Sequence, residues 1–292
     1  MDMKKVMQYL KLIRIKHYLK NVLIFVPAFF GGDIFQKNII VRLLVSFVSF
    51  SLSASFVYIF NDIRDYEQDR LHEEKKKRPI ASGKILRREA ICIAIACIVT
   101  SFWLLTFFDG YRGIPYVLIY ILLNIAYSTG LKKIPIMDVV ILASGFVLRV
   151  LYGAAICNIL CSDWLILTIM TVSLYLGLGK RRNESIKNGN GETREVLRKY
   201  STEYLDDMMH MCMTMSIVFY ALWSTSIGFG ESQNNYFIWT VPIIIILVMK
   251  YEKDISGNSF GDPIEVIYKD KILALLSMIY IIVLVIGKYG QL

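Results

Sequence analysis

Residues 39–60, IIVRLLVSFVSFSLSASFVYIF, form an apolar run that leads directly into the polar sequence NDIRDYEQD at residues 61–69. An apolar stretch of about 20 residues is long enough for a helix to cross the hydrocarbon core of a bilayer. If the helix continues through the polar sequence, its rotation of about 100° per residue places Asp62, Asp65 and Asp69 within about 60° of one another. The sequence therefore predicts a membrane helix with three carboxylates on one face at its end.

Three carboxylates on one face repel each other unless a cation lies between them. Oxygen ligands of this kind suit Mg²⁺, which commonly takes its remaining ligands from substrate phosphates. Asn61 directly precedes the acids and could contribute an amide oxygen. We therefore expect Mg²⁺ at Asp62, Asp65 and Asp69, together with a diphosphate at the membrane surface. The competing interpretation is that these acids are only the solvated end of a membrane helix.

The whole chain has the composition of an integral membrane protein. Of its 292 residues, 55% are hydrophobic and only 20% are charged, and the mean hydropathy is +0.50. Such values lie outside the usual range of soluble domains. The apolar residues occur in nine blocks that predict membrane helices, at residues 21–32, 39–60, 90–108, 113–131, 134–160, 164–179, 208–230, 232–249 and 272–287.

The order of the blocks and of the polar loops predicts an all-α membrane protein with nine transmembrane helices around a central polar cavity. The second and the sixth block each lead into a long polar loop, which suggests two pseudo-repeated four-helix units followed by one more helix. We expect a single domain over residues 1–292, in which the loops 61–89 and 180–207 cap the active site.

Basic residues indicate the orientation, because Lys and Arg concentrate in the cytoplasmic loops of membrane proteins. With the N-terminus inside, 28 of the 33 basic residues fall on the cytoplasmic side. The sequence thus predicts a multi-pass protein of a bacterial or archaeal cell membrane, with a cytoplasmic N-terminus and an external C-terminus. We expect the protein to have the membrane bilayer as its partner and not to bind nucleic acid.

Two basic stretches on the predicted cytoplasmic side could hold phosphate groups. Lys16, Lys20 and Asn21 lie just before the first block, where they could bind a phosphate that enters from the membrane or only anchor the helix by pairing with anionic lipid. Lys77 and Arg78 follow the acidic sequence and could neutralise phosphate oxygens that the metal does not reach.

The fifth block carries two charges within its apolar sequence. Asp138 and Arg149 are eleven residues apart and therefore face the same way on a helix, but about 16 Å separates them along its axis. Charges within a membrane usually line a cavity or pair with each other. We expect this helix to line a polar chamber.

The signature N-D-x-x-D-x-x-x-D at the inner end of the second span, in a chain of nine predicted spans, resembles the UbiA superfamily of intramembrane prenyltransferases. The resemblance covers essentially the whole chain. It is closest to the decaprenyl-phosphate phosphoribosyltransferase branch. The matching stretches are KHYLKN at 16–21, KRPIASG at 77–83, Tyr127-Ser128 with Leu131-Lys132 and Asp138, and Gly179-Lys180-Arg181 with Glu184. Ordinary members place a second Asp-rich motif after the sixth span, where this chain has Lys180-Arg181 instead.

The resemblance implies transfer of a 5-phosphoribosyl group from phosphoribosyl diphosphate to a polyprenyl phosphate. It implies that Mg²⁺ on the three acids stabilises the departing diphosphate, and that Tyr127 and Asp138 contact the ribose or orient a lysine. Lys16, Lys20 and Asn21 would then hold the acceptor phosphate. The residues that would hold the donor phosphates are Lys77, Arg78, Lys132, Lys180 and Arg181.

Two other functions stay open. A prenyltransferase would move a polyprenyl group from prenyl diphosphate to an aromatic or other lipid-soluble acceptor at the same Mg²⁺ site. The basic pair Lys180-Arg181 favours instead a donor with an extra phosphate. A lipid or ion transporter is the alternative of another class, but the phosphate-handling residues lie on one side of the membrane and only Arg149 lies mid-span, which argues against a translocation path.

Overall fold

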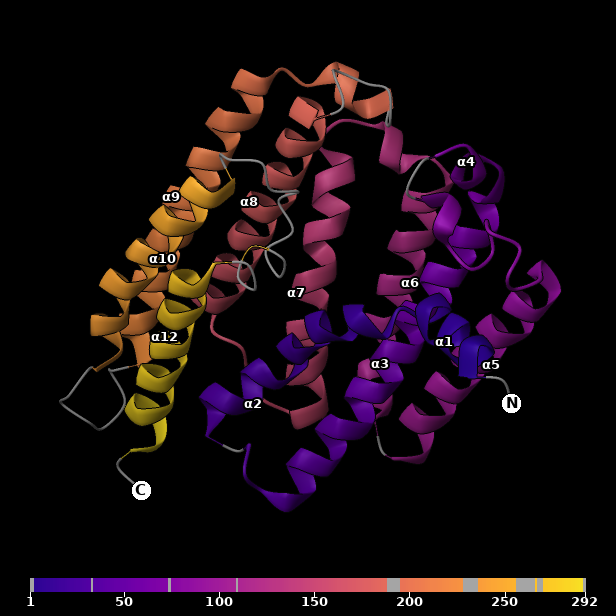
Figure 1. Cartoon of the computed structure of the whole chain (residues 1–292). Coiled ribbons are helices and arrows are strands. Elements are labelled where there is room, and N and C mark those ends of the chain that lie inside the picture. Colours follow the sequence, from indigo (N-terminus) through magenta and orange to yellow (C-terminus); the bar gives the residue numbers. More distant parts are fainter. Residues whose placement is uncertain are drawn as a thin grey trace. The chain divides into compact units, whose positions relative to one another are not determined.

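In the computed structural model, helices are the regular secondary structure of the described residues, joined by turns and loops (Figure 1). These residues are 3–32, 34–72, 75–108, 110–187, 195–227, 236–255, 266 and 270–290. Residues 188–194 of the predicted capping loop 180–207 lie outside the described part of the chain. Each of the nine apolar blocks is mostly helical over its described residues. The periodicity and length of the apolar blocks therefore predicted the class of the fold correctly.

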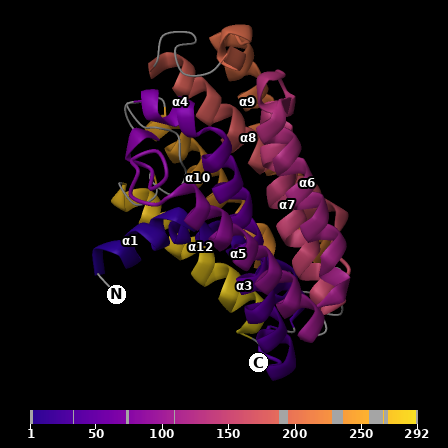
Figure 2. The same ribbon diagram turned by 90° about the vertical axis from the view of Figure 1, so that its right-hand side faces the viewer.

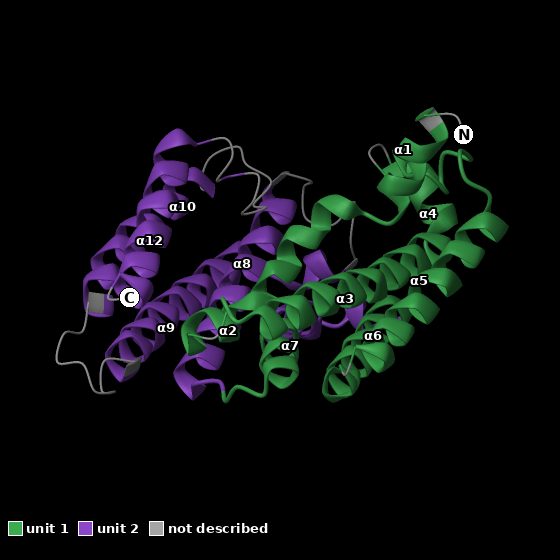
Figure 3. Cartoon of the chain, turned by 90° about the horizontal axis from the view of Figure 1, so that it is seen from below, with its two compact units in different colours: residues 1–129, 148–160 green, residues 130–147, 161–292 purple. Residues whose placement is uncertain are grey.

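The chain forms two compact units (Figure 3). Unit 1 comprises residues 1–129 and 148–160, and unit 2 comprises residues 130–147 and 161–292. Helix α7 (Met137–Cys157) therefore begins in unit 2 and ends in unit 1.

Unit 1 is built on the long helix α3 (Lys37–Arg64), which packs along α5 (Arg87–Phe107), as Figures 1 and 2 show. Small polar residues permit this close packing, because the hydroxyl groups of Ser49 and Ser53 both lie within hydrogen-bond distance of Ser101 Oγ, at 2.9 and 2.7 Å. The other elements of the unit, apart from the end of α7, are α1 (Met3–Leu12), the 3₁₀ helix η1 (Ile15–Phe25), α2 (Val26–Gly31), α4 (Tyr66–Leu71), η2 (Lys75–Lys77), η3 (Tyr111–Gly113) and α6 (Ile114–Thr129).

Unit 2 is organised around α8 (Asp163–Lys187) and α9 (Thr202–Ile227), which pack side by side (Figure 1). Its core includes Tyr175, Leu205 and Met209, all of which are buried. The remaining elements, besides the start of α7, are η4 (Leu131–Lys133), η5 (Glu195–Lys199), η6 (Tyr236–Trp239), α10 (Thr240–Ile255) and α12 (Lys271–Tyr289).

Four of the described helices, α3, α5, α7 and α12, are long and apolar enough to cross a membrane. Helix α12 has few buried residues, and large apolar side chains such as Met278 and Ile282 are exposed on it. Exposed apolar surface of this extent suits contact with lipid. The predicted number of nine transmembrane helices and the orientation of the termini stay predictions.

Candidate functional site

The acidic sequence begins on α3, but this helix ends before it reaches Asp69. Helix α3 ends at Arg64, and Asp65 adopts φ −84° and ψ 10° before α4 begins at Tyr66. This ψ value is about 50° from that of an α-helix, so the backbone bends at Asp65. The prediction of one continuous helix was therefore wrong. The apolar span ends here, and Asp69 on α4 is buried and forms an ion pair with Arg78.

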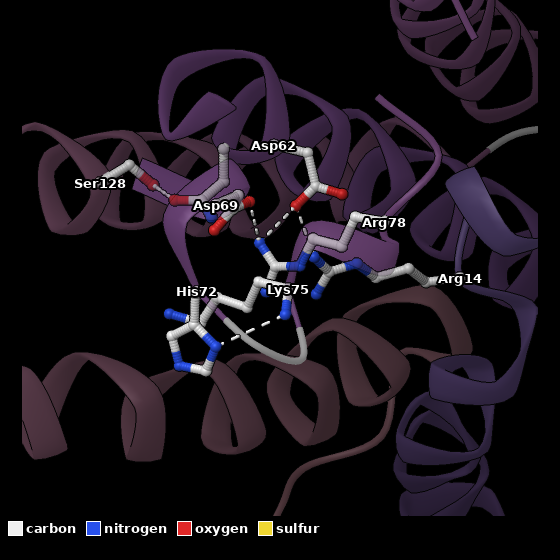
Figure 4. Close-up of polar contacts among 8 residues, drawn as sticks. Arg14, Asp62, Asp69, His72, Lys75, Arg78 and Ser128 are labelled. Carbon is white, nitrogen blue, oxygen red and sulfur yellow. Dashed lines mark hydrogen bonds and ion pairs between the residues drawn. The ribbon is translucent and has the colours of Figure 1, made fainter. Parts of the chain in front are cut away.

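Asp62 and Asp69 converge on one guanidinium group (Figure 4). Arg78 Nη1 donates to Asp62 Oδ1 at 3.0 Å and to Asp69 Oδ2 at 2.7 Å. Arg14 Nη2 donates to the same Asp62 oxygen at 2.6 Å. The two aspartates are only 3% and 2% exposed, so these contacts are largely shielded from water. We call Arg14, Asp62, Asp69 and Arg78 the carboxylate–arginine cluster.

The two arginines reach the cluster from well-packed segments of unit 1. The loop that carries Arg78 is anchored by Ile80 and Ile85, each 1% exposed, in a core cluster with Leu12 and Ile59. Arg14 precedes η1 with a left-handed backbone (φ 54°), and its guanidinium lies 4.7 Å from the centre of the Tyr58 ring. Both arginines are thus held beside the carboxylates by the fold.

Asn61 and Asp65 have different surroundings from the two buried aspartates. Asn61 Oδ1 accepts a hydrogen bond of 3.0 Å from Ser128 Oγ on α6. Asp65 is half-buried at the bend. Within the described ranges, no group of three or more His, Cys, Asp or Glu side chains is placed to hold a metal ion. The structure therefore brings together two of the three predicted metal ligands, and the role of Asp65 stays a prediction.

The carboxylate pair fits Mg²⁺ in the form in which proteins most often bind this ion. Mg²⁺ usually takes one or two carboxylates and completes its shell with water and substrate phosphates. Asp62 and Asp69 already share one cationic group, Arg78, through one oxygen each. The same two oxygens could therefore share a divalent ion.

The N-terminal residues predicted to hold a phosphate have unequal exposure. Lys16 is exposed, Lys20 is half-buried and Asn21 is buried. Asn21 accepts a hydrogen bond from Arg149 Nε at 2.7 Å and donates one to Ser51 Oγ at 2.8 Å. In the loop after α4, Lys77 is exposed, and Tyr127 near the end of α6 is half-buried.

A second buried network lies in unit 2, around Asp138 at the start of α7. Arg181, which is fully buried, donates from Nε to Asp138 Oδ2 at 2.6 Å and from Nη1 to Glu184 at 3.0 Å. Tyr200 donates to Asp138 Oδ1 at 2.7 Å. Burial and the neighbouring Asp138 carboxylate raise the pKa of Tyr200 above its ordinary value, so the hydroxyl keeps its proton and remains a donor.

The basic residues of unit 2 that were predicted to hold donor phosphates also differ in their exposure and contacts. Lys132 is half-buried and Lys180 is exposed, whereas Arg181 is engaged with two carboxylates. Its predicted role stays a prediction.

Sequence reasoning missed Arg14 and Tyr200 as members of these networks. Arg14 is 48 residues from Asp62, and Tyr200 is 62 residues from Asp138. Neither lies in a spacing pattern that indicates such a contact. The sequence offered an indication only for Arg14, because it is one of several basic residues in the N-terminal segment that could pair with an acid.

Comparison of the sequence with known families gives a match over most of the chain. The profile of the UbiA prenyltransferase family matches residues 24–258. The decaprenyl-phosphate phosphoribosyltransferase of Corynebacterium glutamicum is 33% identical and aligns with 96% of this chain and 86% of its own length. The protein of the same name from Mycobacterium tuberculosis is 30% identical over 93% of this chain and 91% of its own.

Solved structures share the fold at lower sequence identity. A UbiA homologue from Archaeoglobus fulgidus bound to GPP and Mg²⁺ superposes with a TM-score of 0.70, at 18% identity, over 96% of this chain and 98% of the other. Digeranylgeranylglyceryl phosphate synthase gives a TM-score of 0.68 at 19% identity, over 99% of this chain and 100% of the other.

Proposed function

The chain belongs to the UbiA prenyltransferase family, and we propose that within this family it transfers a 5-phosphoribosyl group from phosphoribosyl diphosphate to a polyprenyl phosphate in the membrane. The observation that carries the proposal is the identity of 33% with a decaprenyl-phosphate phosphoribosyltransferase over 96% of the chain. The basic pair Lys180-Arg181 after the sixth apolar block agrees with a donor that has an additional phosphate. We also propose nine membrane spans with the N-terminus in the cytoplasm.

Mg²⁺ supplies Lewis-acid neutralisation of the charge that builds up on a departing diphosphate. In our proposal Asp62 and Asp69 hold the ion, with Asp65 and Asn61 as further oxygen donors. The burial of Asp62 and Asp69 supports this assignment, because electrostatic interactions are stronger where water is excluded. The A. fulgidus homologue, which was solved with GPP and Mg²⁺, shares the fold.

The chain's own cations would bind the phosphate groups. In unit 1, Lys16, Lys20 and Asn21 would hold the acceptor phosphate, and Lys77 and Arg78 would hold donor phosphates. The acceptor needs little help from a base, because a phosphate monoester is already ionised near pH 7. The other proposed contacts are Lys132, Lys180 and Arg181 to donor phosphates, and Tyr127 and Asp138 to the ribose or to a phosphate-binding lysine.

Transfer of a prenyl group is the second candidate function, and the family assignment itself favours it. One assay separates the two. Purified protein in detergent is incubated with Mg²⁺, a polyprenyl phosphate and phosphoribosyl diphosphate that carries label in the ribose. Movement of the label into the organic phase supports phosphoribosyl transfer. If this label stays in the aqueous phase while labelled prenyl diphosphate is consumed with a lipid-soluble acceptor, the second function is correct.

Asp62→Asn is the matched variant for this assay, because it keeps the size of the side chain and removes its charge. We expect turnover to fall by at least about 100-fold, since the ligand and its stabilisation of the leaving group are lost together. Glu89→Gln is a suitable control, because this residue pairs with Lys5 outside the cluster. Activity of Asp62→Asn close to that of the parent protein would overturn the metal assignment.

A further inference from the structure

The carboxylate–arginine cluster has a balanced charge. Its two carboxylates and two guanidinium groups sum to zero, and every one of these side chains contacts at least one group of opposite charge at 3.0 Å or less. A divalent cation that entered this cluster alone would add two positive charges next to Arg14 and Arg78. Like charges this close oppose each other strongly where the surroundings are shielded from water.

Arg78 and the metal ion need the same oxygens. Its Nη1 atom bridges Asp62 Oδ1 and Asp69 Oδ2, which are the atoms that would bind the ion (Figure 4). The backbone next to Arg78 is held by the buried Ile80 and by a hydrogen bond of 2.9 Å from Ser82 N–H to the Arg78 carbonyl. The long side chain, 27% exposed, can therefore leave the carboxylates while its backbone stays in place.

We infer that Arg78, assisted by Arg14, is an internal counter-cation that competes with the divalent metal, so that the metal enters the site together with a diphosphate and not before it. The incoming diphosphate offers the displaced guanidinium a new anionic partner. It also supplies the negative charge that balances the added ion. The bridge between Asp62 and Asp69 is thus exchanged for a contact between Arg78 and phosphate.

This inference rests on the proposed metal site but not on the identity of the donor or acceptor. It assigns Arg78 two successive partners and adds Arg14 to the residues that set the affinity for the metal. Arg14 differs from Arg78 because it contacts only Asp62 among the two aspartates and also stacks on Tyr58. Removal of its charge should therefore have the smaller effect.

Binding of Mn²⁺, followed by electron paramagnetic resonance of the purified full-length protein near pH 7.5, tests the inference without any turnover. Without diphosphate, we expect Arg78→Gln to bind Mn²⁺ about tenfold or more tightly than the parent protein, because the competing charge is gone. Arg78→Lys keeps the charge and should stay close to the parent value. Arg14→Gln should tighten binding by a smaller factor, and it serves as the second variant if Arg78→Gln does not fold.

Arg64→Gln is the control for the loss of a positive charge nearby. Arg64 is on the same helix as Asp62, but its guanidinium is exposed and donates to the Thr129 carbonyl at 3.0 Å. We expect its Mn²⁺ affinity to equal that of the parent. Addition of inorganic diphosphate should strengthen Mn²⁺ binding by the parent far more than binding by Arg78→Gln.

The possible failures differ from one another. If Arg78→Gln and Arg14→Gln bind Mn²⁺ no more tightly than the parent, the competition is refuted, and the proposed function is untouched. If no variant binds Mn²⁺ even with diphosphate, the metal site of the proposed function is refuted as well.

Discussion

Arg149 Nε lies 2.7 Å from Asn21 Oδ1, although 128 residues separate the two in the chain. Arg149 is 4% exposed, and its guanidinium also lies about 5 Å from the centres of the Phe50 and Tyr120 rings, at 5.0 and 5.1 Å. Hydrogen bonding and two cation–π contacts therefore compensate for the burial of this charge. The contact also fixes the orientation of the Asn21 amide, which we propose as a contact of the acceptor phosphate.

The first prediction concerns the energetic coupling of this pair. Arg149→Lys loses the planar guanidinium and should lower the free energy of unfolding by about 2 kcal/mol or more. Asn21→Ala should also destabilise the protein. The double variant should lose less free energy of unfolding than the two single variants lose together, with a coupling energy of about 1 kcal/mol or more. Unfolding by SDS in mixed micelles measures the free energy of unfolding of the three variants. Strict additivity would contradict the energetic importance of the contact.

The second prediction concerns the close approach of α7 and η1 within unit 1. A Cβ atom on Gly153 would lie 2.0 Å from the carbonyl oxygen of Ile24, so the backbone must move to admit it. Gly153→Ala should destabilise the protein by about 2 kcal/mol or more, as overpacking does. Gly179→Ala on α8 is the control, because its Cβ would lie 3.3 Å from the flexible end of Met209 and at an ordinary contact distance of 3.7 Å from Ile255 Cδ1. A thermal-unfolding midpoint of Gly153→Ala at or above that of Gly179→Ala would show that the approach is not tight.

The third prediction concerns backbone strain just before α7. Ile136 has φ 71°, a conformation that is costly for a β-branched residue, and its N–H donates to the hydroxyl group of Tyr200. Ile136→Gly should be more stable than Ile136→Ala by about 1 kcal/mol, because glycine adopts this conformation without strain. Both variants lose the same half-exposed side chain. Equal melting temperatures in detergent would contradict the expected strain.

The fourth prediction compares a buried and a partly exposed ion pair on adjacent residues of α8. Asp138→Asn removes a charge partner of the fully buried Arg181 and should lower the free energy of unfolding by about 3–5 kcal/mol. Arg182→Gln breaks the ion pair between Arg182 and Asp206, in which the two side chains are 18% and 36% exposed. This change should lower the free energy of unfolding by about 1 kcal/mol or less. Chemical unfolding of the two variants tests the difference. Losses of similar size would mean that the solvent reaches the Asp138 network.

The fifth prediction is a pH dependence at the start of α12. The Lys250 ammonium group and the Leu273 N–H hold the pKa of Asp270 below its usual value of 3.8. A carboxylate whose pKa is lower in the folded state adds stability above its ordinary pKa and loses it as the pH falls through the folded value. Asp270→Asn should therefore have a lower melting temperature than the parent protein at pH 6–7. The difference in melting temperature should disappear below about pH 4. A gap that stays constant over this range would contradict the role of the charge.

Sequence reasoning could predict the helices and part of the site. Apolar blocks of sufficient length define helices almost irrespective of their neighbours, which is why the helical class and the membrane character followed from composition. Asp62 and Asp69 could also be identified, because the end of a membrane helix is an unusual place for repeated acids. Their grouping did not, however, arise from one regular helix, since the backbone bends at Asp65.

The partners of the charged residues could not be predicted. Asp138 and Arg149 lie on the same helix and were expected to line one chamber, but each has its own network, with Arg181 in unit 2 and with Asn21 in unit 1. These contacts join residues that are 43 and 128 positions apart. Long-range pairing of this kind depends on tertiary packing, which helical periodicity does not report.

The division of α7 between the two units has a consequence for how the protein is made. Residues 148–160 complete unit 1, yet the ribosome synthesises them only after residues 130–147, which belong to unit 2. Unit 1 therefore cannot finish folding as an independent N-terminal piece during insertion into the membrane. A chain truncated at residue 129 should expose the surfaces that the end of α7 normally covers, and quality-control proteases should remove it.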